Sequence, residues 1–173
     1  MSIARKMQMA AAGAAAVEGW DLANAAYNGS PVNWFYVGAQ ETSPSGVFFK
    51  PDGTKMYIVG YTGDDVNEYS LSTAWDISTA SYVRNKIVSA QDTFPTDVFF
   101  KGDGTKMYIV GTTGDAVYEY SLSTAWNIST ASYVQNFSVT AQEPNPLGLF
   151  FKPNGTKMYI VGTTRYAVFA YDL

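Results

Sequence analysis

The stretch from Val47 to Gly60, VFFKPDGTKMYIVG, decides the fold of this chain because the chain repeats it twice. It returns as VFFKGDGTKMYIVG at residues 98–111 and as LFFKPNGTKMYIVG at residues 149–162. The copies begin at 47, 98 and 149, so the spacing is 51 residues. A fixed period of this size is typical of a propeller, in which each repeat forms one small sheet. A kelch-like or solenoid arrangement is the alternative.

Each repeat predicts four strands joined by short turns. The glycine of the PDGT, GDGT and PNGT turns, such as Gly53, is placed for the positive φ that a tight hairpin requires. The segments rich in β-branched and aromatic residues give the strands. In the first repeat they cover residues 46–50, 55–60, 65–71 and 81–90. We therefore predict an all-β propeller of four-stranded antiparallel blades.

The segments FFKPDGTKMYIVG at 48–60 and VNEYSLSTAWDIST at 66–79 also carry a family resemblance. They resemble the YVTN-type propeller repeats of surface-layer and lactonase-like proteins. They resemble more closely the tandem repeats of bacteriophage structural and tail proteins, over nearly the whole chain beyond Trp20. This resemblance implies a non-enzymatic virion protein, in a tail appendage or fibre or as capsid decoration, that binds other virion proteins.

Two parts of the chain are expected to differ in role. Residues 1–19 are rich in alanine and predict a short helix or tail that anchors the protein to other virion proteins. They resemble a secretory signal only superficially, because the apolar part is mostly alanine, and they are too mild to span a bilayer. Residues 20–173 predict the three-blade domain. Its repeats are 46–96, 97–147 and 148–173, with the N-terminal strand region 20–45.

The two ends of the repeat region complement each other. Leu173 corresponds to the last residue of a third strand, whereas WDLANAAY from Trp20 matches the WDISTASY that begins at Trp75 and leads into a fourth strand. The N-terminal region is thus expected to complete an unfinished blade. Three blades closed within one chain fall below the usual four to eight, while two chains that exchange strands give six. We therefore predict a homo-oligomer formed by strand exchange, with a dimer favoured.

Composition excludes several classes of function. The chain has no cysteine and no histidine, which removes disulfides, thiol nucleophiles and the commonest general base. Its net charge of −4, without a basic run, argues against a nucleic acid or an anionic membrane as partner. We predict no cofactor and no metal.

Loop residues on one face of the predicted propeller differ between the repeats and are candidate ligand contacts. Aromatic rings with carboxylates suit carbohydrate, so a host glycan is a candidate ligand and a free sugar-binding lectin is the alternative function. Solvated loop tips without a ligand are the simpler interpretation. Asp64 and Asp65 beside Glu68 predict an exposed turn rather than a calcium site. The candidates are Tyr61, Asp64, Asp65, Phe94, Asp115, Tyr118, Asn145, Arg165 and Tyr166.

A second group of residues is expected at interfaces between subunits or blades. Strand alternation places Phe35 on the face opposite Trp34 and Tyr36. Trp75 and Trp126 recur at one position of the repeat and predict packing between blades. The interface candidates are Met7, Met9, Trp20, Trp34, Phe35, Tyr36 and Leu173.

A lactonase-like hydrolase is the function that the sequence favours least. The predicted first strands contain a single carboxylate, Asp97, on the side of the central channel. One carboxylate cannot serve as an acid–base pair. The sequence therefore predicts no enzyme activity and no catalytic residue.

Overall fold

The computed structural model describes Leu22 and residues 34–173, and within them it contains three antiparallel sheets. Sheet A has strands β1 (Pro44–Phe49), β2 (Lys55–Gly60), β3 (Asp65–Leu71) and β4 (Ala80–Ile87). Sheet B has β5 (Pro95–Phe100), β6 (Lys106–Gly111), β7 (Ala116–Leu122) and β8 (Ala131–Ser138). Sheet C has β9 (Pro146–Phe151), β10 (Lys157–Gly162) and β11 (Val168–Asp172). The all-β prediction is confirmed.

The hairpin between the first two strands of each sheet follows the predicted turn. Gly53, Gly104 and Gly155 have φ values of 72°, 73° and 75°, which side chains rarely tolerate. In sheet A the carboxylate of Asp52 also accepts a 3.0 Å hydrogen bond from the amide of Thr54. These local bonds fix the turn in the same way in every repeat.

Strand bounds follow the sequence in the two middle strands and differ at the first and fourth, and β1 begins at Pro44 and ends at Phe49 where 46–50 was predicted. β2 and β3 have their predicted bounds of 55–60 and 65–71. β4 ends at Ile87, before the predicted 90, because Val88 leaves the ladder. Its amide donates to the carbonyl of Asp64 at 2.8 Å, and its own carbonyl accepts the amides of Gln91 and Asp92.

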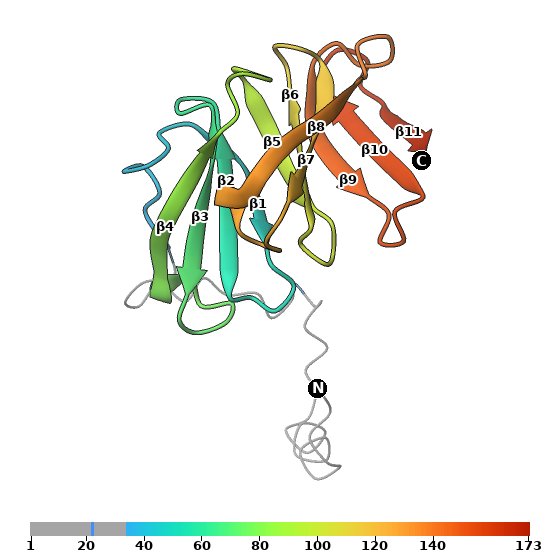
Figure 1. Cartoon of the computed structure of the whole chain (residues 1–173). Helices are drawn as coiled ribbons and strands as arrows, with labels where there is room; N and C mark the ends of the chain where they lie inside the picture. Colours follow the sequence, from blue (N-terminus) through green and yellow to red (C-terminus); the bar gives the residue numbers. More distant parts are fainter. Residues whose placement is uncertain (1–21, 23–33) are drawn as a thin grey trace, which may run out of the picture. The chain divides into compact units, whose positions relative to one another are not determined.

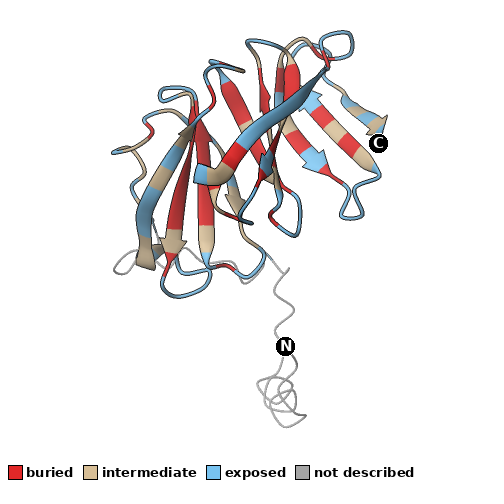
Figure 2. Cartoon of the chain, viewed as in Figure 1, coloured by how far each residue is buried: buried red, intermediate tan, exposed pale blue. Residues whose placement is uncertain are grey.

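Sheet B lies between sheets A and C (Figure 1). The first strands β1, β5 and β9 are neighbours, and their phenylalanines touch edge to face. The ring centroids of Phe48 and Phe99 are 5.4 Å apart, and those of Phe99 and Phe150 are 5.7 Å apart. Figure 2 shows the most buried residues on the middle strands of sheets A and B, while β11 is partly or fully exposed.

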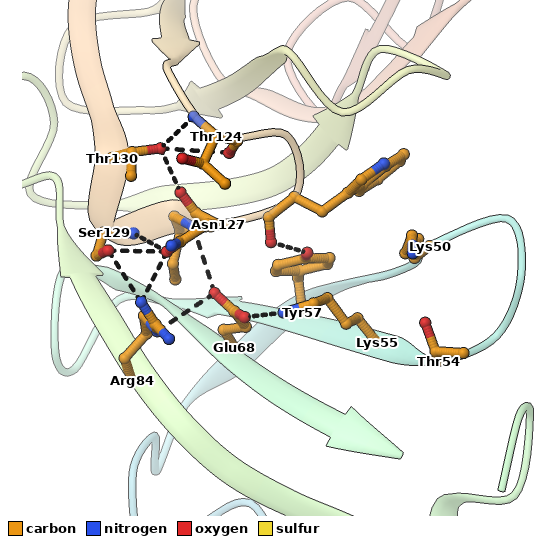
Figure 3. A network of polar contacts seen from close by, with 12 residues as sticks. Lys50, Thr54, Lys55, Tyr57, Glu68, Arg84, Thr124, Asn127, Ser129 and Thr130 are labelled. Atoms are coloured by element: carbon orange, nitrogen blue, oxygen red, sulfur yellow. Dashed lines mark hydrogen bonds and ion pairs between the residues drawn. The ribbon is translucent and has the colours of Figure 1, made fainter. Parts of the chain in front are cut away.

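A polar network joins sheet A to the loop between β7 and β8 (Figure 3). The buried carboxylate of Glu68 pairs with Lys55 and accepts a 3.3 Å hydrogen bond from the amide of Ile128. Arg84 donates to the side chains of Asn127 at 2.7 Å and Ser129 at 2.9 Å. The loop from sheet B is therefore held against sheet A by side chains of β3 and β4.

The predicted anchoring segment, with Met7 and Met9, lies outside the described residues, as does Trp20. Among the residues that the structure does describe, no helix is long and apolar enough to cross a membrane.

Candidate functional site

One face of the protein is shaped by a buried carboxylate that recurs in each repeat. Glu41, Asp92 and Glu143 lie in the loops that precede the first strands, and at most 2% of their surface is exposed. Glu143 accepts hydrogen bonds of 3.0 Å from the amides of both Thr164 and Arg165. Glu41 and Asp92 accept the equivalent pair of amides in their own sheets. Each carboxylate thus ties two loops together, and we call the surface that these loops form the loop face.

The carboxylate at Glu143 shows why this arrangement is stable. Burial alone opposes its ionisation, but three backbone amides, including that of Asn145, donate to it and hold its pKa below the usual value. These three carboxylates were not among the predicted site residues. The available signal was the Gln–acid pair in QETSP, QDTFP and QEPNP, which stays constant within loops that otherwise differ.

Two aromatic candidates meet on the loop face. Tyr61 follows β2 of sheet A, and Phe94 precedes β5 of sheet B. Their ring centroids are 4.0 Å apart and their planes differ by 11°, so the rings are stacked, and each is 40% exposed. The stacked pair forms a partly exposed apolar cluster between two sheets, which we call the aromatic platform.

Asp97 lies close in sequence to this platform and reaches all three first strands. It is on β5, where its Oδ1 accepts a 2.8 Å hydrogen bond from the amide of the next residue, Val98. Its Oδ2 accepts the amide of Leu149 on β9 at 2.9 Å. On the other side is Gly46 of β1, where an added Cβ would lie 2.8 Å from Oδ1. A side chain at Gly46 would therefore displace the carboxyl group.

The surroundings of Asp97 make its ionisation harder than in water. Burial raises the pKa of this carboxyl group, and the hydrogen bonds from Leu149 and Val98 offset the rise only in part. Gly46 and Gly148 occupy the same repeat position in sheets A and C. Asp97 is therefore a feature of one repeat rather than of the general blade pattern.

Two of the predicted ligand contacts are instead used within the fold. Asp65 is buried and accepts 2.6 Å hydrogen bonds from the side-chain amides of Asn67 and Asn85. Burial raises its pKa against the effect of these two bonds. Tyr118 is also buried and donates to Asp92 at 3.2 Å. Neither side chain is open to a ligand from the loop face.

The other loop candidates are at least partly accessible. Asp64, Asp115 and Tyr166 share one turn position with φ values of 48°, 46° and 54°. Asn145 bonds to Thr163, and the Tyr166 side chain is 88% exposed. Within residues 34–173 and Leu22, no three acidic side chains are grouped so that they could hold a metal ion.

The interface candidates that the structure describes fall on two sides of one segment. Phe35 packs edge to face on Tyr69 with 5.4 Å between ring centroids, while Trp34 and Tyr36 are exposed. This confirms the predicted alternation. Leu173 is exposed at the end of sheet C.

The repeated tryptophans differ in burial. Trp126 packs between sheets A and B, against Phe48 and Phe100, which confirms its predicted role. Trp75 stacks on Phe49 within sheet A but remains 59% exposed.

Comparisons with known proteins find the fold among solved structures. No protein-family model matches the chain, and no curated protein matches it. A protein named as a 6-phosphogluconolactonase from Bacteroides uniformis matches with a TM-score of 0.59 and 14% identity, over 75% of this chain and 37% of that one. The periplasmic gluconolactonase of Pseudomonas aeruginosa matches with 0.56 and 13%, over 75% and 35%. Hydrazine synthase of Kuenenia stuttgartiensis matches with 0.56 and 17%, over 86% and 36%.

These likenesses show a propeller fold, and this chain spans about a third of the length of each protein named. They also correct the functional prediction. The prediction of a non-enzymatic phage virion protein is wrong, because the similar structures include lactonases and nothing in the comparisons points to a phage. The physical reason is that the repeated motif specifies strands and turns, which enzymes and structural proteins of this fold share.

Proposed function

We propose that the three sheets are 51-residue blades of a propeller that hydrolyses the lactone of a sugar acid, with Asp97 as the general base. The observation that carries this proposal is the position of Asp97, held among the three first strands, three residues after the aromatic platform begins at Phe94. The lactonases among the similar structures support the reaction class.

The reaction needs one base and one water molecule. The carboxylate of Asp97 takes a proton from water as the water oxygen attacks the lactone carbonyl carbon. The ring C–O bond then breaks, and the departing oxygen receives that proton from Asp97. Lactone and water become one hydroxy acid, and Asp97 returns to its carboxylate form.

The hydrogen bonds of Asp97 leave it able to act. Each oxygen accepts one amide, from Val98 or Leu149, and a carboxylate oxygen has a second lone pair that remains for water. Burial brings the pKa of Asp97 closer to neutral pH, where a carboxylate is a stronger base. A single base meets the needs of this reaction, since the acid–base pair of a glycosidase is not required.

The aromatic platform suits the substrate. Tyr61 and Phe94 present an accessible apolar surface between two blades, on which the apolar face of a sugar ring can pack. Such packing would orient the lactone, while its hydroxyl groups remain in water or contact the loops.

The charge of the loop face favours a neutral lactone over a phosphorylated one. Arg165 is the one cation in the described loops of this face. The carboxylates of the loop face repel a phosphate group at close range. They are Glu41, Asp64, Asp92, Asp115 and Glu143.

The test is proton release during hydrolysis of glucono-1,5-lactone and its 6-phosphate, with the spontaneous rate subtracted. We expect faster hydrolysis of the neutral lactone, and a loss of about 100-fold or more in kcat for Asp97→Asn. Asp103→Asn is the matched control, because the third repeat carries Asn154 at that turn and Asn154 makes the same bonds to Thr156. A wild-type rate that does not exceed the spontaneous one, or a folded Asp97→Asn variant with full activity, would contradict the proposal.

A further inference from the structure

An open pocket of about 620 Å³ lies between sheets B and C. Its walls include Tyr108 and Glu119 of sheet B, and Phe151, Met158 and Tyr171 of sheet C. The walls are mainly apolar, with the carboxylates of Glu119 and Asp172 among them. We call this space the Trp pocket, because a tryptophan fills the equivalent space between sheets A and B.

The equivalent space between sheets A and B is filled by a loop of the chain. Trp126 lies there, with its ring centroid 5.6 Å from that of Phe100, and Ile128 is fully buried beside it. Tyr57 donates to the carbonyl of Trp126 at 2.7 Å, and Glu68 accepts the amide of Ile128. These bonds and ring contacts show which side chains fit the space.

The Trp pocket has the same walls without the filling loop. The first two wall residues, Tyr108 and Glu119, lie one 51-residue period after Tyr57 and Glu68, and Phe151 lies one period after Phe100. The period therefore places a tyrosine, a carboxylate and a phenylalanine around both spaces. The occupant should accordingly carry tryptophan followed, two residues later, by an aliphatic side chain.

Apart from the segments at Trp75 and Trp126, which pack on Phe49 and Phe100, one segment of the chain has this pattern. Trp20-Asp21-Leu22 corresponds to Trp75-Asp76-Ile77 and to Trp126-Asn127-Ile128. Leu22 is in 3-10 conformation, as are η2 (Ile77–Thr79) and η3 (Ile128–Thr130), which begin at the matching residues. Leu22 is also 86% exposed, although its counterpart Ile128 is fully buried.

The position of Phe35 shows which copy of the pocket this segment can reach. Phe137, its counterpart on β8, pairs with Val117 and packs on Tyr171 of the following sheet. Phe35 packs on Tyr69 of sheet A in the same way. A strand through Phe35 would therefore pair with the β11 of a sheet that precedes sheet A. In this chain sheet B separates sheet C from sheet A, so that β11 must come from another copy.

The exposed faces of sheets A and C are complementary halves of one interface. Val161 and Val168 of sheet C are 44% and 68% exposed, whereas their counterparts in sheets A and B are at most 4% exposed. On sheet A, Val47 is 56% exposed although its counterpart Val98 is 2% exposed. Trp75 and Phe150 are likewise exposed on these two faces. Each face has the residues that a neighbouring sheet buries elsewhere in the chain.

We infer that two copies of this chain join head to tail into one closed ring, in which residues 20–37 of each copy fill the Trp pocket of the other and pair with its β11. Phe35 of one copy then lies opposite Val168 of its partner, by the register of Phe137 with Val117. The exposed edge of β11 is covered in the same step. This inference concerns assembly and does not depend on the proposed hydrolysis.

The first test is the solution mass of the full chain by multi-angle light scattering and sedimentation over a range of concentrations. We expect about twice the chain mass of 18.9 kDa. Trp20→Ala should raise the dimer dissociation constant about 30-fold or more, as the loss of a central buried tryptophan does. Tyr133→Ala removes a ring that packs on Tyr120 within sheet B and does not line the pocket, so it should leave the constant unchanged.

A second pair of variants guards against misfolding. Val168→Asp places a charge on an exposed residue of β11 and should yield a folded monomer, while Val134→Asp on the exposed side of β8 should remain dimeric. A full chain that sediments as a monomer or a trimer would overturn the inference. So would Trp20→Ala and Val168→Asp variants with unchanged dimer affinity. A monomer destabilised by Trp20→Ala would place the segment in its own chain and contradict exchange.

Discussion

The phenol of Tyr57 donates a 2.7 Å hydrogen bond to the main-chain carbonyl of Trp126, and this bond links β2 of sheet A to the loop before β8 of sheet B. Tyr57 is fully buried. Tyr57→Phe removes the donor but keeps the ring, so the carbonyl loses its partner. We expect the free energy of unfolding to fall by about 1–3 kcal/mol in urea titrations. Tyr166→Phe, at an exposed side chain, is the control and should be neutral.

The buried carboxylate of Glu143 should stabilise the fold in a pH-dependent way. Its pKa is lower in the folded chain than its usual 4.5, so its contribution is complete above that value and is lost as the pH falls through the folded pKa. Glu143→Gln should cost about 1–3 kcal/mol at pH 7, because three amide donors face an acceptor with half the oxygens. The stabilities of both proteins should converge as the pH falls through the lowered pKa of Glu143. A difference that is constant with pH would contradict this role.

The titration of Asp97 should appear in the hydrolysis rate. Burial raises its folded pKa above the usual 3.8, so the active carboxylate form is lost at a higher pH than for an exposed aspartate. We expect kcat/KM to fall as the pH drops through this raised pKa. The profile is measured with neutral lactone after the spontaneous rate is subtracted. An acid limb at or below 3.8 would show that another group controls activity.

Asp97 affects stability with the opposite sign to Glu143. Because its folded pKa is raised, the folded chain holds the proton more tightly than the unfolded chain does. Between the usual and the raised pKa its contribution to stability therefore declines as the pH rises. Subtracting the stability of Asp97→Asn from that of the wild type at each pH should reveal this decline. A difference that grows with pH would contradict the raised pKa.

The aromatic platform should act on substrate binding. Phe94→Ala removes one of the two stacked rings, so we expect KM to rise about tenfold, or about 1.4 kcal/mol, with little change in kcat. Phe94→Tyr keeps a ring and serves as the control. If Phe94→Ala lowered kcat and left KM unchanged, the ring would act in the reaction step instead of binding.

The strands were predictable because their signals are local and occur in each repeat. The bounds of β2 and β3 follow from short β-branched and aromatic runs, and the hairpin follows from Gly53 in its turn. The end of β4 was less predictable. It depends on a hydrogen bond from Val88 to Asp64, which are 24 residues apart, from 64 to 88.

The site was predictable only in part, because its contacts join residues that are far apart in the sequence. The sequence placed Tyr61 and Phe94 on one face, but their stacking depends on how two sheets pack. Asp97 was visible as a lone carboxylate, whereas the amide of Leu149 that holds it comes from another repeat. Asp65 was counted among the loop residues, although the asparagines that donate hydrogen bonds to it lie on the strands.

The most direct test of ring closure by two copies is a cross-link between Phe35→Cys and Val168→Cys. The chain contains no native cysteine, so a short bismaleimide reports only the two introduced thiols. When two preparations, each with one of these substitutions, are mixed, we predict a covalent dimer. Phe35→Cys mixed with Val134→Cys should give none above background. If the first mixture gave no more dimer than the second, residues 20–37 would not pair with β11 of another copy, and the two-copy ring would be wrong.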